Sequence, residues 1–182
     1  MGFWSLLRRG RFERTGFELY GAAVAAARDP YLYTDVGVPD TLDGRFDLVG
    51  LHAFLLIQRL RHELPPGPAL AQAVFDAMFS DMDVNLREMG VGDLSVGRKV
   101  RIMWEAFHGR SAVYAAALNS DDTDALETAL IRNVWRGDRP SNGAAEALRR
   151  LVLAQEAHLA TQDLASLMRG DADFLPAKEA AR

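Results

Sequence analysis

Residues 79–110, FSDMDVNLREMGVGDLSVGRKVRIMWEAFHGR, join two long helical patterns through a short turn. Gly90 stands where a left-handed residue commonly ends a helix. Ser95 is predicted to cap the second helix, whose apolar stripe reaches Leu118. The stretch therefore predicts an antiparallel helical hairpin over about 68–118. Before the turn, apolar side chains recur every three or four residues and share one face: Phe75, Met78, Phe79, Met82, Leu86 and Met89.

Composition favours one helical domain. The chain has 182 residues and no cysteine, which excludes disulfides, thiolate metal sites and thiol catalysis. Its net charge of -4 does not favour indiscriminate binding to nucleic acid, and no specific DNA binding is predicted. The longest apolar run, 48–57, is far shorter than the roughly 20 residues that span a bilayer. Because alanine, leucine and arginine dominate, we predict an all-α fold, a single compact domain of six or seven helices.

Further helices are predicted on both sides of the hairpin. Residues 45–61 are apolar at nearly every helical angle, which indicates a buried central helix. The other helices are expected over 15–28, around 126–134, and from about 143 to a bend near Thr161. Gly170 is expected to close the helical domain, which we place at 15–170, with a flexible tail over 171–182.

Residues 1–14 form a separate basic segment. It carries Trp4 among Arg8, Arg9 and Arg11, with a single acidic residue. A basic segment with an aromatic anchor can lie among lipid headgroups, so we assign these four residues to a membrane surface. The alternative is a frayed terminus or a strap packed on the domain.

No catalytic or metal-binding constellation emerges from the residues. Asp81 and Asp83 are two apart on a helix and should point away from each other, so no metal ion is predicted. His52 lies in an apolar helix, where a histidine is more often a satisfied core residue than a ligand. The chain also lacks phosphate-binding glycine loops and HExxH motifs. We therefore predict a binding protein without a cofactor rather than an enzyme.

A basic cluster near the start of the second hairpin helix indicates a different kind of contact. Arg98, Lys99 and Arg101 lie close together there, and a helix start favours anions rather than cations. A basic cluster of this kind is typical of a surface that binds an acidic or phosphate-bearing partner. Neutralisation by nearby acids such as Glu105 is the alternative.

Two stretches, VGVPDTLDGRFDLVGLHAFLLIQRL at 36–60 and MFSDMDVNLREMGVGDLSVGRKVRIMWEAFHGR at 78–110, resemble the ubiquinol-cytochrome c chaperone family, the bacterial relatives of the mitochondrial assembly factor for cytochrome b. The likeness covers about residues 20–118, and His108 stands where many relatives have tyrosine. It implies an all-helical, non-enzymatic chaperone that engages newly made cytochrome b during assembly of respiratory complex III. It also implies a cytoplasmic protein that can contact the inner membrane, or a matrix-side protein in mitochondria, with the ribosome and a small co-chaperone as further partners.

A client surface follows from the residues and the resemblance together. We predict that it comprises the loop from Asp40 to Asp47 and the hairpin, and we assign these residues to it: Arg45, Phe46, Asp47, His52, Asp81, Asp83, Arg87, Arg98 and Lys99. Two alternatives stay open. One is an enzyme or small-molecule binder with a pocket between the second, third and fourth helices that uses His52 and Asp81. The other is an RNA- or ribosome-binding module built on Arg98, Lys99 and Arg101, which predicts strongly salt-dependent association.

Overall fold

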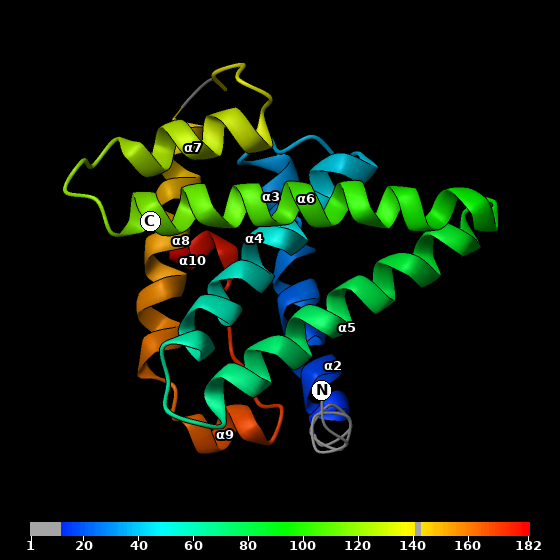
Figure 1. Ribbon diagram of the computed structural model, residues 1–182. Helices are drawn as coiled ribbons and strands as arrows, with labels where there is room; N and C mark the ends of the chain where they lie inside the picture. Colours follow the sequence, from blue (N-terminus) through cyan, green and yellow to red (C-terminus); the bar gives the residue numbers. More distant parts are fainter. Residues whose placement is uncertain (1–11, 141–142) are drawn as a thin grey trace.

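The computed structural model describes residues 12–140 and 143–182, and every regular element within these ranges is a helix (Figure 1). The prediction of an all-α, single compact domain is confirmed. None of the helices in the described ranges has the length and apolarity to cross a membrane. In chain order the helices are α2 (Glu13–Ala27), α3 (Tyr31–Thr34), α4 (Leu42–Arg61), α5 (Gly67–Glu88), α6 (Asp93–Leu118), α7 (Ala125–Val134), α8 (Ala144–Thr161), α9 (Leu164–Met168) and α10 (Ala177–Ala180).

The longer helices correspond to the predicted ones, and the short ones were missed. Six helices have ten residues or more, namely α2 and α4 to α8. The remaining three, α3, α9 and α10, have four or five residues each. One helical turn is too short to display a 3.6-residue apolar period, which explains why the sequence pattern does not show them.

Helix α4 forms the centre of the core, as predicted. It contacts α2, α5, α6, α7 and α8, and Leu48, Leu56 and Leu60 are completely buried. It begins three residues earlier than expected, at Leu42, because the Thr41 hydroxyl accepts a hydrogen bond from the Gly44 backbone N–H at 3.1 Å. A capping hydroxyl of this kind satisfies one of the free donors at a helix start.

Helices α2 and α5 cross at very short distance because a glycine lies between them. A Cβ atom added at Gly16 would stand 2.6 Å from the backbone carbonyl carbon and oxygen of Ala73. Further along the same contact, the Tyr20 hydroxyl donates to Asp81 at 2.8 Å. Close backbone packing and one buried polar contact thus fix α2 against α5.

Helices α5 and α6 form the predicted hairpin, and its distal end projects beyond the body of the domain (Figure 1). Gly90 follows α5 with a positive φ of 80°, which confirms its role at the helix end. The prediction that Ser95 caps α6 is wrong, because α6 already begins at Asp93 after Gly92 in an extended conformation. Ser95 therefore lies inside the first turn and is exposed.

The C-terminal tail is packed rather than flexible, so that prediction is wrong. Residues 171–176 run antiparallel to α8 and lead into α10 (Figure 1). The Gln155 side-chain amide donates to the Leu175 carbonyl at 2.7 Å and accepts from its N–H at 2.9 Å. Gln162 makes the equivalent pair with Asp173, at 2.6 and 3.0 Å. These hydrogen bonds use the backbone of the tail, while Ala177, Ala180 and Ala181 place only small side chains in the core, so the sequence pattern gives little signal of the docking.

Candidate functional site

Two residues predicted to contact a partner are enclosed in the protein. Asp47 is 3% exposed and His52 is 1% exposed. The His52 Nδ1–H donates to the Leu48 carbonyl at 2.8 Å, and the imidazole packs edge-on against the Phe174 ring at 5.6 Å between centroids. Burial lowers the pKa of His52. Their assignment to a partner surface is wrong, because both lie on the inner faces of α4.

Asp47 belongs to a buried charge cluster that the sequence analysis did not identify. Arg110 of α6 forms an ion pair with one carboxylate oxygen of Asp47, and Arg136 approaches the other to 2.7 Å. Burial raises the pKa of Asp47, although both guanidinium groups oppose that shift. The cluster links α4, α6 and the end of α7. Its sequence signal was Arg110 itself, which stands between Phe107 and Tyr114 at helical spacing, on the apolar face of α6.

Neighbouring Phe46 and Arg45 have different surroundings. The Arg110 guanidinium lies over the Phe46 ring, 5.6 Å from its centroid, so this ring is partly covered. Arg45 is exposed and pairs with Asp40 at 2.6 Å. The start of α4 therefore offers Arg45 to solvent, while Phe46 is partly enclosed and Asp47 is held inside.

The alternative of a pocket shared by His52 and Asp81 finds no support in the geometry. His52 lies in the core, whereas the carboxylate of Asp81 accepts the Tyr20 hydroxyl between α2 and α5. Burial and this hydrogen bond raise the pKa of Tyr20. Asp83 turns instead to Arg87, at 2.7 Å, which confirms that the two aspartates point apart. We therefore remove Asp81 from the partner surface.

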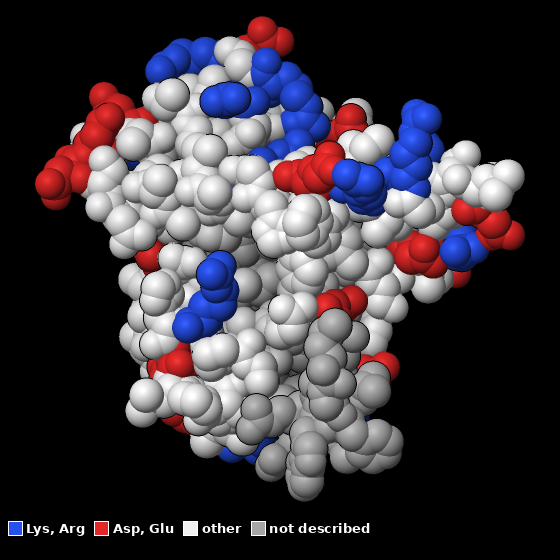
Figure 2. All heavy atoms as spheres, viewed as in Figure 1, with Lys and Arg blue, Asp and Glu red and all other residues white. Residues whose placement is uncertain are grey.

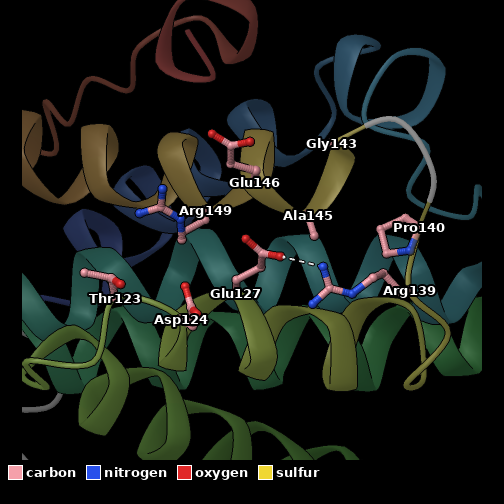
Figure 3. A pocket seen from close by; sticks show the side chains of 9 residues that line it. All are labelled: Thr123, Asp124, Glu127, Arg139, Pro140, Gly143, Ala145, Glu146 and Arg149. Carbon is pink, nitrogen blue, oxygen red and sulfur yellow. Dashed lines mark hydrogen bonds and ion pairs between the residues drawn. The ribbon is translucent and has the colours of Figure 1, made fainter.

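A cavity of about 330 Å³ lies between α7, α8 and the segment that joins them (Figure 3). Its charged lining comprises Asp124, Glu127, Arg139, Glu146 and Arg149. Within it, Arg139 pairs with Glu127 at 3.3 Å. Three carboxylates thus face two guanidinium groups, and this near balance selects neither an anion nor a cation. A second cavity, of about 540 Å³, lies between the end of α8 and the start of the tail, and neither His52 nor Asp81 lines either cavity.

The methionine-rich face of α5 is also part of the core. Met78 is fully buried, and Met82 and Leu86 are each 6% exposed. This face packs within the domain, so it does not present a free apolar groove. The apolar surface of the hairpin lies elsewhere.

Exposed apolar side chains concentrate on the hairpin. Of eleven large apolar residues that are exposed in the described structure, six belong to it: Val84, Met89, Leu94, Ile102, Trp104 and Val113. Isolated apolar side chains on a surface are ordinary, but a concentration on one projecting element indicates an interaction site. The four on α6 occupy two separate sides of that helix, whereas Val84 lies on α5 and Met89 directly after it.

One side faces α5 and is aromatic; we call it the aromatic flank, and it comprises Phe75, Phe79, Trp104 and His108. The Trp104 and His108 rings lie 4.0 Å apart between centroids, and His108 lies 5.4 Å from Phe75. Phe75 in turn packs on Phe79 at 4.8 Å. Trp104 is 45% exposed, so the flank combines a base of tilted and edge-on rings with an accessible indole.

The opposite side is the outer stripe, formed by Leu94, Arg98 and Ile102, with Lys99 beside it. Residues four apart in a helix lie on one face, so the three stripe residues are neighbours. Within the described part of the chain, neither Arg98 nor Lys99 forms an ion pair. Arg101 does, with Glu105 at 3.0 Å. The predicted neutralisation therefore applies to Arg101 alone.

The remaining charges of the hairpin cross its turn. Arg87 pairs with Asp83 on α5 and with Asp93 at the start of α6. One guanidinium group thus connects the two helices at their distal end. Trp4, Arg8, Arg9 and Arg11, which we assigned to a membrane surface, lie outside the described residues.

Comparison with known proteins gives consistent matches. The family model described as ubiquinol-cytochrome C chaperone matches residues 34–174. A Xenopus laevis protein named ubiquinol-cytochrome-c reductase complex assembly factor 1 is 24% identical over 136 residues, which are 74% of this chain and 68% of that protein. The crystal structure of the Cbp3 homolog from Brucella abortus superposes with a TM-score of 0.82 at 34% identity, over 98% of this chain and 99% of the other. The family match includes the entire α5–α6 hairpin.

Proposed function

Because this chain belongs to the ubiquinol-cytochrome C chaperone family, we propose that it assists assembly of ubiquinol-cytochrome c reductase by holding newly made cytochrome b. The name of the Xenopus relative, an assembly factor of that complex, supports the process. In this proposal the chain acts by binding and not by catalysis. The ribosome and a small co-chaperone are additional proposed partners, and the site of action is the face of the inner membrane where the client is made.

The observation that carries the proposal is the exposed aromatic flank on a projecting hairpin. A membrane-protein client offers apolar helices before it is assembled, and such a helix can lie along a hydrophobic groove. Tryptophan is among the residues that most often dominate the affinity of an interface. Trp104, exposed yet supported by His108 and Phe75, has that character.

Charged residues around the flank would form the polar rim of the interface. Asp83 and Arg87 lie at the distal end of the hairpin and are partly exposed, at 39% and 47% of their side chains. Arg98 and Lys99 are on the other side of α6, and Arg45 lies at the start of α4. We retain Arg45, Phe46, Asp83 and Arg87 as proposed client contacts, whereas Arg98 and Lys99 stay proposed contacts of an acidic or phosphate-bearing partner. Rim charges mainly influence association rate and its salt dependence.

Site-specific photo-crosslinking tests the proposal. An aromatic photoreactive residue, which keeps a ring at the position of the indole, replaces Trp104 in the native cells, and crosslinked proteins are identified by mass spectrometry. Leu153 on α8 is the matched control, because it is apolar and 39% exposed against 45% for Trp104. We expect cytochrome b to be captured from position 104 and not from position 153.

A pair of alanine variants separates binding from folding. Trp104→Ala should lower capture of cytochrome b, measured by co-purification without a crosslinker, about tenfold or more, as expected for an aromatic anchor that an interface buries, while Leu153→Ala leaves capture unchanged. Both variants should unfold at nearly the same denaturant concentration as the wild type. Equal capture by the two variants, or no cytochrome b at position 104 in a folded protein, would reject the proposed surface.

A further inference from the structure

The distal end of the hairpin exposes large apolar side chains to solvent. Leu94, in the first turn of α6, is 101% exposed, so its side chain touches almost nothing. Met89, just after α5, is 51% exposed, and Ile102, two turns further along α6, is 54% exposed. These residues surround a turn that projects from the domain (Figure 1).

Unpaired cations accompany these aliphatic groups. Arg98 lies between Leu94 and Ile102 on the outer stripe, and Lys99 follows it. Both are exposed, and neither has an ion-pair partner within residues 12–140 and 143–182. Apolar and basic side chains thus alternate along one helical stripe.

We propose that this end of the hairpin docks on an anionic lipid bilayer. Leu94 and Ile102 would enter the boundary between headgroups and acyl chains, while Arg98 and Lys99 contact lipid phosphates. Surface-bound helices combine these two features, aliphatic insertion and attraction of basic side chains to anionic lipid. The inference goes beyond the proposed client binding and requires no particular client.

The charge distribution also defines how the hairpin would meet the bilayer. Figure 2 shows cationic side chains on the upper edge of the projecting hairpin and a mostly acidic cluster on its lower edge. Acidic residues at the distal end are Asp83, Glu88 and Asp93, two of which are already held by Arg87. An anionic surface attracts the first edge and repels the second, so the outer stripe would face the lipid. The aromatic flank, on the other side of α6, would stay accessible at the bilayer surface.

A lipid surface suits these residues better than RNA does. Binding to single-stranded RNA combines cations with aromatic rings on which bases stack. The outer stripe instead places aliphatic Leu94 and Ile102 beside its cations, and the exposed aromatic residue Trp104 lies on the other side of α6. Aliphatic side chains gain free energy from leaving water for a lipid boundary.

The absence of cysteine permits a direct test with the full chain. A single cysteine replaces Leu94, and an environment-sensitive fluorophore is attached to it; Leu153 on α8 provides the control site. Vesicles of phosphatidylcholine alone and of phosphatidylcholine with phosphatidylglycerol are added separately. We expect a blue shift from position 94 with the anionic vesicles only, and none from position 153.

Charge-reversal variants complete the test. Arg98→Glu with Lys99→Glu should weaken binding to the anionic vesicles about tenfold or more, since each cation near such a surface contributes substantially. Arg61→Glu with Arg132→Glu is the matched control, because both arginines are exposed and the change in charge is the same. We expect this control to bind within about twofold of the wild type.

Three results would overturn the inference. The first is binding of the protein to anionic vesicles without a blue shift from position 94, which places the membrane contact elsewhere in the chain. The second is equal weakening by the two double variants, which indicates a general effect of net charge. The third is salt-sensitive binding to RNA through Arg98 and Lys99 without vesicle binding. Cytochrome b crosslinking is measured separately, so failure of either proposal is distinguishable from failure of the other.

Discussion

Replacing Asp47 by asparagine should destabilise the fold markedly. The substitution keeps the shape of the side chain but removes the charge that faces Arg110 and Arg136. Asp47 is 1% exposed at its side chain, whereas the two arginines are 22% and 47% exposed. Removing one partner of a fully buried ion pair costs about 3–5 kcal/mol. Because both arginines retain contact with water, we expect a loss of about 2–3 kcal/mol in the free energy of unfolding.

The cluster need not be a large net stabiliser for this loss to occur. Burial raises the pKa of Asp47 despite the two guanidinium groups, so desolvation outweighs the attraction that the carboxylate receives. Asparagine offers one acceptor oxygen in place of two, so one guanidinium group meets an amide N–H2 donor where it had a carboxylate oxygen, and this lost acceptor is what costs free energy. The carboxylate of Asp47 therefore affects the free energy of unfolding through the two arginines that it contacts.

Urea unfolding followed by circular dichroism measures the effect, with Asp43→Asn as control. Asp43 lies at 4.0 Å from Arg136 and its side chain is 82% exposed, so its loss should cost less than about 0.5 kcal/mol. The m-value should be the same for all three proteins if the unfolded state is unaltered. A loss below about 0.5 kcal/mol for Asp47→Asn would refute the reasoning that two arginine contacts to a buried carboxylate are lost.

Two further predictions concern packing and pH. Gly16→Ala should lower the free energy of unfolding by about 1–3 kcal/mol, since the new methyl group would meet the backbone of Ala73 at 2.6 Å. Gly21 is in the same helix with nothing within 4 Å, so Gly21→Ala should instead raise the free energy of unfolding by up to about 1 kcal/mol. Equal effects of the two substitutions in denaturant unfolding would contradict the close crossing of α2 and α5. Because burial lowers the pKa of His52 from its usual 6.5, the unfolded state takes up more protons as pH falls through that value, and wild-type stability should decline between about pH 7 and pH 5. His52→Phe should reduce that decline in unfolding experiments across this range, and parallel pH profiles for the two proteins would show that His52 does not titrate as a buried group.

The sequence predicted the long elements well because their patterns are dictated by local geometry. Gly90 ended α5 as expected, since a position that needs positive φ favours glycine. The all-round apolar character of residues 45–61 correctly indicated the central helix. The same observation already implied that Asp47 and His52 were enclosed, because a helix surrounded by protein has no free face. The prediction that Asp47 and His52 contact a partner therefore conflicted with the prediction that residues 45–61 form a buried central helix.

The parts that the sequence did not predict depend on contacts between distant segments. Helical periodicity does not reveal that Arg110 of α6 and Arg136 of the turn after α7 converge on one carboxylate. The tail looked mobile because two of its anchors are glutamine amides bonded to its backbone. Its core side chains, Ala177, Ala180 and Ala181, are small and give only a weak apolar signal. On the hairpin, exposure of Leu94 and Trp104 required the three-dimensional structure, since helical phase alone cannot tell which side of α6 is covered.

The docking of the tail has a consequence for the order in which the domain is completed during synthesis. Asp29 accepts a hydrogen bond from the backbone N–H of Ala177, a residue 148 positions later, at 3.0 Å. Phe174 likewise covers His52 of the central helix. The N-terminal portion leaves the ribosome before Phe174 and Ala177 are synthesised, so one side of α4 stays uncovered until then. The domain can close only after residues 174–177 have been translated, and an emerging chain that stalls before residue 174 would expose its own core to other nascent proteins.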